Sequence, residues 1–313
     1  LDIQVIFNAN HDSLAANPDT LPAGLLLILP CEGGALTAEA EAGAIIAEEE
    51  KKQETKKKKN KLYEPPLKFV SANGWAPFTD SALEGGGMLN RLAMTSLQRG
   101  GNDREATLDW VDDWNAHLET LLPTGAMDIS VAWDPPDCDE LAELEEDEQY
   151  RCTAFDYSLP LYEVAFSLFT LTDSKFAAAT KAEDFAGARV CRPGNWDTDA
   201  LEEMDLVDPL ITLVELPSLS DCAEALVNGE VDVFGEGIES ATALFTQLGA
   251  ADKVAANPYL VEFEQLSLIV AKNNPRGRVY LAMVNRGLTE MRETGEWYDI
   301  IASSLEEFNK ASQ

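Results

Sequence analysis

The sequence is poor in histidine, in basic residues and in long apolar runs. Its 313 residues include only two histidines, His11 and His117, which excludes a metal site built from several histidines. Lys and Arg together number 23 against 56 Asp and Glu, giving a formal net charge of −33. Such a surface repels phosphate groups, which argues against binding to nucleic acid or to anionic membranes. No apolar run approaches the roughly 20 residues that span a bilayer.

The sequence also lacks the short motifs of common catalytic sites. It contains no nucleophile elbow, no phosphate-binding Walker loop and no two-histidine zinc motif. The acidic run 137–148 lacks the spacing of a calcium-binding loop. Paired carboxylates are frequent, but a chain this acidic brings carboxylates together by chance. The sequence therefore predicts a protein that is not an enzyme and that uses no cofactor or metal.

The apolar content is sufficient for two domains or one two-lobed unit. Hydrophobic residues make up 45% of the chain, with 12 Phe, 6 Trp and 7 Tyr. The negative charge is concentrated in residues 62–266, whereas residues 32–61 and 267–313 are balanced. We expect this charge mainly to keep the protein soluble. The alternative is an electric field that favours cationic or zwitterionic solutes.

The first 65 residues differ in composition and apolar pattern from the rest of the chain. Residues 1–31 contain an Asn17-Pro18-Asp19 turn, then Pro22-Ala23-Gly24 and an apolar strand at 25–29. This pattern resembles the second half of a LysM domain, a small module that binds peptidoglycan and chitin. Because the first half is absent, peptidoglycan binding and a packing appendage that binds no glycan both remain open. Residues 32–65, rich in Ala and Glu and then in Lys, are predicted to be a linker.

From residue 66 onward, short apolar runs alternate with helical patterns. Helices are predicted at 85–98, where Met88, Leu92 and Leu97 share one face, at 220–229 and at 276–295. The alternation predicts an α/β fold with parallel sheets that carry helices on both faces. Strands are predicted at 67–72, 106–111, 127–133, 163–171, 188–193, 210–217, 231–236 and 264–272.

Several motifs occur in a recognisable order between residues 67 and 310. Gly74-Trp75-Ala76-Pro77-Phe78 follows the first predicted strand, Arg151 precedes Tyr157-Ser158-Leu159-Pro160 by six residues, and AEALVNGEVD occupies 223–232. This series resembles the periplasmic solute-binding proteins of polar amino-acid ABC transporters (family 3, type II).

The resemblance implies a two-lobed periplasmic-binding-protein fold with two doubly wound sheets. Lobe one is expected at 66–164 plus 267–313 and lobe two at 165–266. Two crossing strands near 163–171 and 262–270 would join the lobes. A small solute would bind between them, at the carboxyl ends of the strands.

Arg151 is the predicted anchor for a carboxylate of the ligand. It is the only Lys or Arg between Arg104 and Lys175, and a guanidinium holds a carboxylate through two parallel hydrogen bonds. The alternative is a salt bridge within the protein, to a nearby acid such as Asp134 or Glu163.

The resemblance also indicates further ligand-binding residues. The acidic anchor for the ligand's amino group falls at Gly237 in the family pattern, so the preceding Glu236 is predicted to take that role. An aromatic clamp for an apolar or cationic group is predicted, with core packing as the alternative for each ring. The other predicted ligand-binding residues are Trp75, Phe78 and Trp133 of lobe one and Gly194, Asn195 and Trp196 of lobe two.

Five cysteines allow two disulfides. Cys138 and Cys152 bracket an acidic insertion, and a bond between them would hold the segment that carries Arg151. Cys191 ends a predicted strand and Cys222 begins a helix expected on the same sheet, so these two are predicted to pair. Cys31 is left over. Two disulfides indicate an oxidising compartment, whereas five reduced cysteines would place the protein in the cytosol.

Together these features predict a periplasmic protein that binds a small zwitterionic solute, an amino acid or a related molecule. The lobes would close on the ligand and deliver it to a membrane ABC permease. The chain starts at Leu1 without a signal peptide, so we expect a mature or truncated form. The alternative function is a cell-wall-associated structural or sensory protein that keeps the fold without transport.

Overall fold

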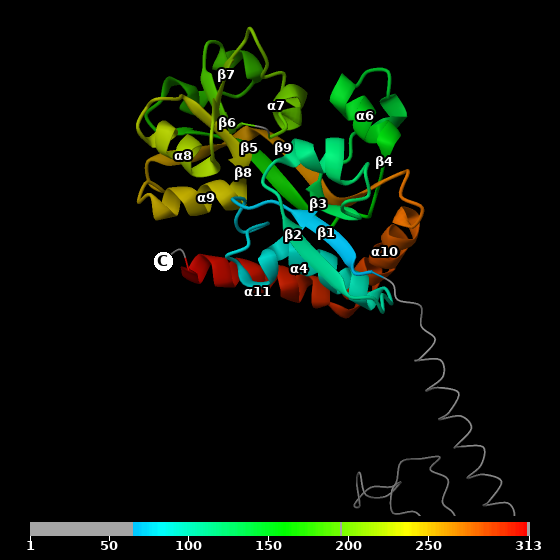
Figure 1. Ribbon diagram of the computed structural model, residues 1–313. Helices are drawn as coiled ribbons and strands as arrows, with labels where there is room; N and C mark the ends of the chain where they lie inside the picture. Colours follow the sequence, from blue (N-terminus) through cyan, green and yellow to red (C-terminus); the bar gives the residue numbers. More distant parts are fainter. Residues whose placement is uncertain (1–64, 195, 312–313) are drawn as a thin grey trace, which may run out of the picture. The chain divides into compact units, whose positions relative to one another are not determined.

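The computed structural model describes residues 65–194 and 196–311 of the 313-residue chain. The LysM-like segment, the predicted linker up to residue 64, Cys31 and Asn195 therefore lie outside the described residues. Figure 1 shows the described part as strands flanked by helices, with α4 and α11 along the bottom of the view, α10 at the right and α8 and α9 at the left.

The strands of the described residues form a nine-stranded sheet. Its order is β2-β1-β3-β9-β5-β8-β6-β7, with β4 also paired to β9. The strands are β1 Leu67–Ser71, β2 Ala106–Trp110, β3 Ile129–Trp133, β4 Phe155–Tyr157, β5 Tyr162–Leu171, β6 Arg189–Pro193, β7 Thr212–Leu216, β8 Val233–Gly237 and β9 Val254–Ala271. Strand β1 runs parallel to β2 and β3, and β6 runs parallel to β7 and β8. We call the half with β1 to β4 lobe one and the half with β6 to β8 lobe two.

Strands β5 and β9 connect the two halves. They pair antiparallel from Tyr162 opposite Leu266 to Leu171 opposite Val254. The last residues of β9 then pair with β3 and β4 of lobe one. The predicted two-lobed α/β fold is confirmed, while the exact lobe boundaries stay a prediction. The sequence analysis missed the first half of β9, because residues 254–263 carry polar residues and a proline that interrupt the apolar pattern.

Helices cover both halves of the sheet. The main ones are α4 Met88–Arg99, α10 Gly277–Thr294 and α11 Glu296–Ala311 in lobe one, and α8 Leu219–Val227 and α9 Ile238–Gln247 in lobe two. Met88, Leu92 and Leu97 of α4 are buried on one face, as predicted. The shorter helices are η1 Glu84–Gly86, α5 Trp114–Ala116, η2 His117–Leu121, η3 Cys138–Glu140, α6 Glu146–Ala154, η4 Lys175–Ala178, η5 Ala182–Phe185 and α7 Asp199–Glu203.

The contact between α4 and α10 depends on two glycines. A Cβ atom on Gly287 would lie 1.8 Å from the carbonyl oxygen of Ser96, and one on Gly100 would lie 1.8 Å from that of Met283. No side chain fits at either place, so the two backbones approach directly. This close contact fixes the helical layer of lobe one.

The core consists of two groups of buried side chains. The larger group includes Phe69, Leu92 and Ile269 of lobe one and extends to Cys191 and Phe234 of lobe two. The smaller group lies in lobe two and includes Phe166, Phe176, Phe185, Val190 and Val233. The larger group therefore continues from lobe one into lobe two, and lobe two contains a second packed interior.

Both predicted disulfides are confirmed. Cys138 is bonded to Cys152 with a Cα–Cα distance of 5.5 Å, and Cys191 is bonded to Cys222 at 5.6 Å. The first bond joins η3 to α6, and the second joins β6 to α8.

Candidate ligand-binding site

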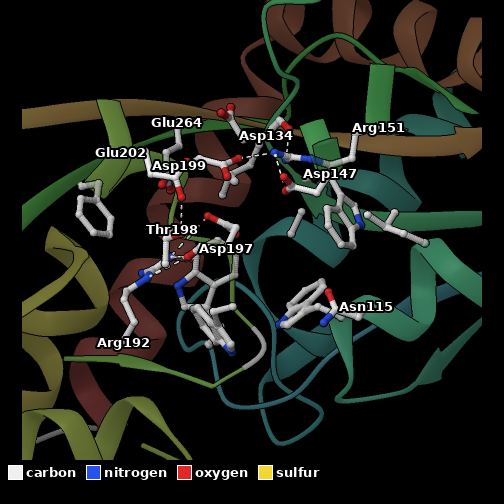
Figure 2. A pocket seen from close by; sticks show the side chains of 18 of the residues that line it. Asn115, Asp134, Asp147, Arg151, Arg192, Asp197, Thr198, Asp199, Glu202 and Glu264 are labelled. Carbon is white, nitrogen blue, oxygen red and sulfur yellow. Dashed lines mark hydrogen bonds and ion pairs between the residues drawn. The ribbon is translucent and has the colours of Figure 1, made fainter. Parts of the chain in front are cut away.

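A cavity of about 480 Å³ lies between the two lobes (Figure 2). This volume lies within the range of pockets that hold small molecules. Side chains from the carboxyl ends of parallel strands reach it from both sides: Trp75 after β1, Trp133 at the end of β3, Arg192 near the end of β6 and Glu236 near the end of β8. This is the edge at which open α/β sheets bind ligands.

The cavity brings together most of the residues that the sequence analysis selected. Five of them line it: Trp75, Trp133, Arg151, Trp196 and Glu236. Phe78 is fully buried beside the cavity, with its ring 5.0 Å from that of Trp75, and supports that ring from behind. Gly194 is not among the lining residues, and Asn195 is outside the described residues.

Four tryptophans form a cluster in this cavity. Trp114, which the sequence analysis missed, lies 6.5 Å from Trp75, 5.6 Å from Trp133 and 6.4 Å from Trp196, measured between ring centroids. Trp75 lies 5.4 Å from Trp196 across the lobes. The interplanar angles of these four pairs are between 74° and 89°, so the rings meet edge to face.

Two of the tryptophans are held by hydrogen bonds from their indole nitrogens. Nε1 of Trp75 donates to Oε1 of Glu236 at 2.9 Å, and Nε1 of Trp133 donates to Oγ of Ser130 at 2.7 Å. The strand register shifts between Val131 and Trp133, where Ala132 has a φ of 74°. Such a bulge redirects the next side chain, and a strained non-glycine residue often marks a functional site.

A buried histidine fixes the position of Trp133 further. Nε2 of His117 lies 2.7 Å from the carbonyl oxygen of Val111, so this nitrogen carries the proton. Nδ1 then accepts a hydrogen bond from Oγ of Ser130 at 2.9 Å. Burial lowers the pKa of His117, which keeps the ring neutral. Hydrogen bonds therefore run from Trp133 to Ser130, from Ser130 to His117 and from His117 to Val111, and each has one donor and one acceptor.

Arg151 is buried and bonded to the opposite lobe. Its side chain is 5% exposed, and Nη2 forms an ion pair with Asp199 of α7 (Figure 2). Nη1 donates to the backbone carbonyl of Asp134 at 3.3 Å, while Nε has no hydrogen-bond partner in the part of the chain that the structure describes. Burial alone would lower the pKa of this guanidinium, but Asp199 outweighs it and raises the pKa. The salt bridge that the sequence analysis held open thus exists, with Asp199 rather than Asp134 or Glu163 as partner.

A second arginine, Arg192, was missed by the sequence analysis. Its side chain is 5% exposed, and Nη1 lies 3.3 Å from Oε2 of Glu236. Nη2 donates to the carbonyl oxygen of Asp197 at 2.9 Å. The guanidinium lies 5.0 Å from the ring centre of Phe166 and 5.7 Å from that of Trp196. Glu236, the predicted partner of a ligand's amino group, is therefore shared by Arg192 and Trp75.

Carboxylates dominate the cavity wall. Of the described residues that line the cavity, nine are acidic and two are basic. Burial, helped by Asp197, raises the pKa of Asp134 and of Asp199 to about 7. Burial, with the repulsion of Asp197 and Asp134, also raises the pKa of Glu264. Burial thus disfavours the ionised form of these carboxyl groups, and an incoming positive charge would favour it.

We expect the protein to be less stable at pH 8 than at pH 5. In the unfolded chain, Asp134 and Asp199 titrate near pH 4, whereas burial raises the pKa of both to about 7 in the folded protein. The folded state therefore binds more protons between these values. The stabilisation is complete below the unfolded pKa and is lost as the pH rises through the folded pKa.

Thermal unfolding at constant ionic strength measures this effect. We expect the melting temperature to fall by about 5 °C from pH 5 to pH 8. Asp134→Asn should reduce the fall, and the exposed control Asp252→Asn should leave it unchanged. A melting temperature that rises over this range, or an equal fall in all three proteins, would contradict the assignment.

Two further findings concern the described residues alone. No group of three or more His, Cys, Asp or Glu side chains is placed there to hold a metal ion. Within the same residues, no helix is long and apolar enough to cross a membrane.

Comparison with known proteins identifies the fold. No protein-family model matches the chain, and no curated protein matches it. A mutant of ArgBP from T. maritima is 20% identical, with a TM-score of 0.59 over 77% of this chain and 95% of that protein. An amino-acid ABC transporter substrate-binding protein of Streptococcus pneumoniae, bound to L-arginine, is 17% identical, with a TM-score of 0.59 over 78% of this chain and 95% of that one.

A third similar structure has another role. It is a histidine kinase sensor domain with similarity to periplasmic binding proteins, 17% identical, with a TM-score of 0.59 over 77% of this chain and 96% of that domain. Identities this low establish the fold rather than the ligand. The described part of the chain has the periplasmic-binding-protein fold found in the substrate-binding proteins of amino-acid ABC transporters.

Proposed function

We propose that this protein binds a small solute carrying an ammonium group, an amino acid or a related molecule, and delivers it to an ABC permease. The observation that carries the proposal is the cavity between the lobes, with tryptophans and carboxylates contributed by both sides. Tryptophan faces and carboxylates both attract an ammonium group. Similar structures include proteins whose names describe arginine binding and amino-acid transport.

Closure of the lobes would couple ligand binding to delivery. Two contacts join the lobes across the cavity: Trp75 to Glu236 at 2.9 Å, and Arg151 to Asp199. Strands β5 and β9 connect the lobes and provide the hinge. A ligand that touches both lobes favours the closed state in proportion to its extra contacts there. The permease would then recognise the closed form.

The disulfides support a location outside the cytoplasm. Cys138–Cys152 and Cys191–Cys222 would both be reduced in a cytosolic protein of an ordinary mesophile. A periplasmic or otherwise extracytoplasmic location therefore fits both the covalent structure and the proposed uptake function.

Isothermal titration calorimetry with a panel of amino acids and amines tests the binding function. We expect at least one compound to bind, and Trp196→Ala to weaken that binding about tenfold, because the ring supplies one wall of the cavity. Tyr259→Ala, at a side chain that is 68% exposed, is the control and should bind normally. If no compound in the panel binds, the proposed function is wrong.

A sensory role is the second candidate, because one similar structure is a histidine kinase sensor domain. Sensing and transport share the binding step and differ in its consequence. Uptake of the radiolabelled ligand by cells with and without this protein separates them. Loss of uptake supports transport, whereas unchanged uptake with an altered transcriptional response supports sensing.

A further inference from the structure

Among the described residues that line the cavity, no guanidinium fork is left unpaired for a ligand carboxylate. Arg151 is neutralised by Asp199 through Nη2, with Asp147 3.9 Å away. Arg192 is neutralised by Glu236 at 3.3 Å. A ligand carboxylate would have to displace one of these acids and leave its charge unpaired beside other carboxylates. Nε of Arg151 makes no hydrogen bond among the described residues, but the atom is buried, and one N–H group does not replace the fork that holds a carboxylate.

Two of the four tryptophans, Trp75 and Trp133, likewise offer no free indole donor to a ligand carboxylate. Nε1 of Trp75 is committed to Glu236, and Nε1 of Trp133 is committed to Ser130. A tryptophan ring can still attract a cation through the negative face of its π system. With Trp114 and Trp196, these two tryptophans pack edge to face at centroid distances of 5.4 to 6.5 Å, so the four rings form one continuous aromatic wall.

The charge of the wall favours cations as well. Figure 2 shows Asp134, Asp147 and Asp199 gathered around Arg151, so one guanidinium faces several carboxylates. Glu264 lies close enough to Asp134 and Asp197 to be repelled by both. Among the described lining residues, seven more are acidic than basic. An incoming carboxylate would be repelled, and an incoming ammonium group would relieve the repulsion.

We infer that the cavity selects a small organic cation without a carboxylate group, an alkyl mono- or diammonium ion, in preference to a zwitterionic amino acid. This inference rests on the proposed solute-binding function and narrows its ligand class. One ammonium group lies against the wall formed by the four tryptophans. In a diammonium ion, the second lies among Asp134, Asp199 and Glu264.

Matched pairs of compounds that differ by one carboxylate test the inference. Cadaverine is compared with lysine and agmatine with arginine, by calorimetry at pH 7.5 with the intact protein. We expect each amine to bind at least about tenfold more tightly than its amino acid. Equal or tighter binding of the amino acids overturns the inference and leaves the proposed function intact. Absence of binding by all four probes overturns the inference, and the proposed function fails as well if no other compound of the amino-acid and amine panel binds.

Asp199→Asn examines the role of the ion pair. This change removes one negative charge and frees the Arg151 fork, so lysine should gain and cadaverine should lose affinity. The expected fall in the cadaverine-to-lysine preference is about tenfold or more. Asp252→Asn removes the same charge at an exposed site of lobe two. A preference that is unchanged in Asp199→Asn, or that changes equally in the control, overturns the inference.

Discussion

Replacing Glu236 by alanine is expected to lower the free energy of unfolding by about 3–5 kcal/mol. Glu236 is 1% exposed, and its carboxylate neutralises the buried Arg192 at 3.3 Å. Without it, the nearest side-chain carboxylate to the guanidinium is that of Asp197, 3.6 Å away and half exposed. The Nε1 donor of Trp75 also loses its acceptor. Urea unfolding followed by tryptophan fluorescence measures the loss.

Three further variants test the cause of this effect. Glu236→Gln keeps an acceptor for Trp75 but not the charge, so its loss should be intermediate. Adding Arg192→Met to Glu236→Ala should recover part of the stability, because no buried charge is then left unpaired. The exposed Glu224→Ala should change the free energy of unfolding by no more than about 0.5 kcal/mol. A loss below about 1 kcal/mol in Glu236→Ala would mean that the pair contributes little.

Arg151 illustrates what sequence order can predict and what it cannot. The motif before Tyr157 placed this residue at the cavity, and the structure agrees. Its partner was sought among acids nearby in the chain, Asp134 and Glu163, but Asp199 lies 48 residues away on the other lobe. The pairing depends on how the two lobes face each other, and no local spacing encodes that arrangement.

Other residues also show that local sequence patterns do not encode contacts between distant parts of the chain. Trp114 was missed because it belongs to no motif and reaches the cavity through the short helix that follows β2. Arg192 did carry a signal, since a charged residue in the apolar run ARVCRP requires a buried partner. Phe78 was placed correctly along the chain, but the motif does not say which side of the loop faces the ligand. The structure buries its ring behind Trp75.

The two disulfides are expected to serve different purposes. Removing Cys191–Cys222, which closes a loop of 31 residues, should lower the free energy of unfolding by about 4 kcal/mol in the chain-entropy model. Removing Cys138–Cys152, with a separation of 14, should lower it by about 3 kcal/mol. Both cysteines of the Cys191–Cys222 bond are fully buried. Cys191 precedes the cavity-lining Arg192, but β6 is also held in place by its pairing with β7 and β8.

The Cys138–Cys152 bond acts instead on the cavity, because Cys152 directly follows Arg151 in α6. Without the bond, α6 is anchored less firmly, and the ion pair from Arg151 to Asp199 loses its fixed geometry. The Cys138→Ala/Cys152→Ala variant should therefore bind ligand at least about fivefold more weakly at 25 °C, a difference of about 1 kcal/mol. The Cys191→Ala/Cys222→Ala variant should keep its affinity while folded and lose more stability. Calorimetry measures the ligand affinity of both variants, and urea unfolding measures their stability. Unchanged affinity in Cys138→Ala/Cys152→Ala with weakened binding in Cys191→Ala/Cys222→Ala would show that α6 is held by packing alone.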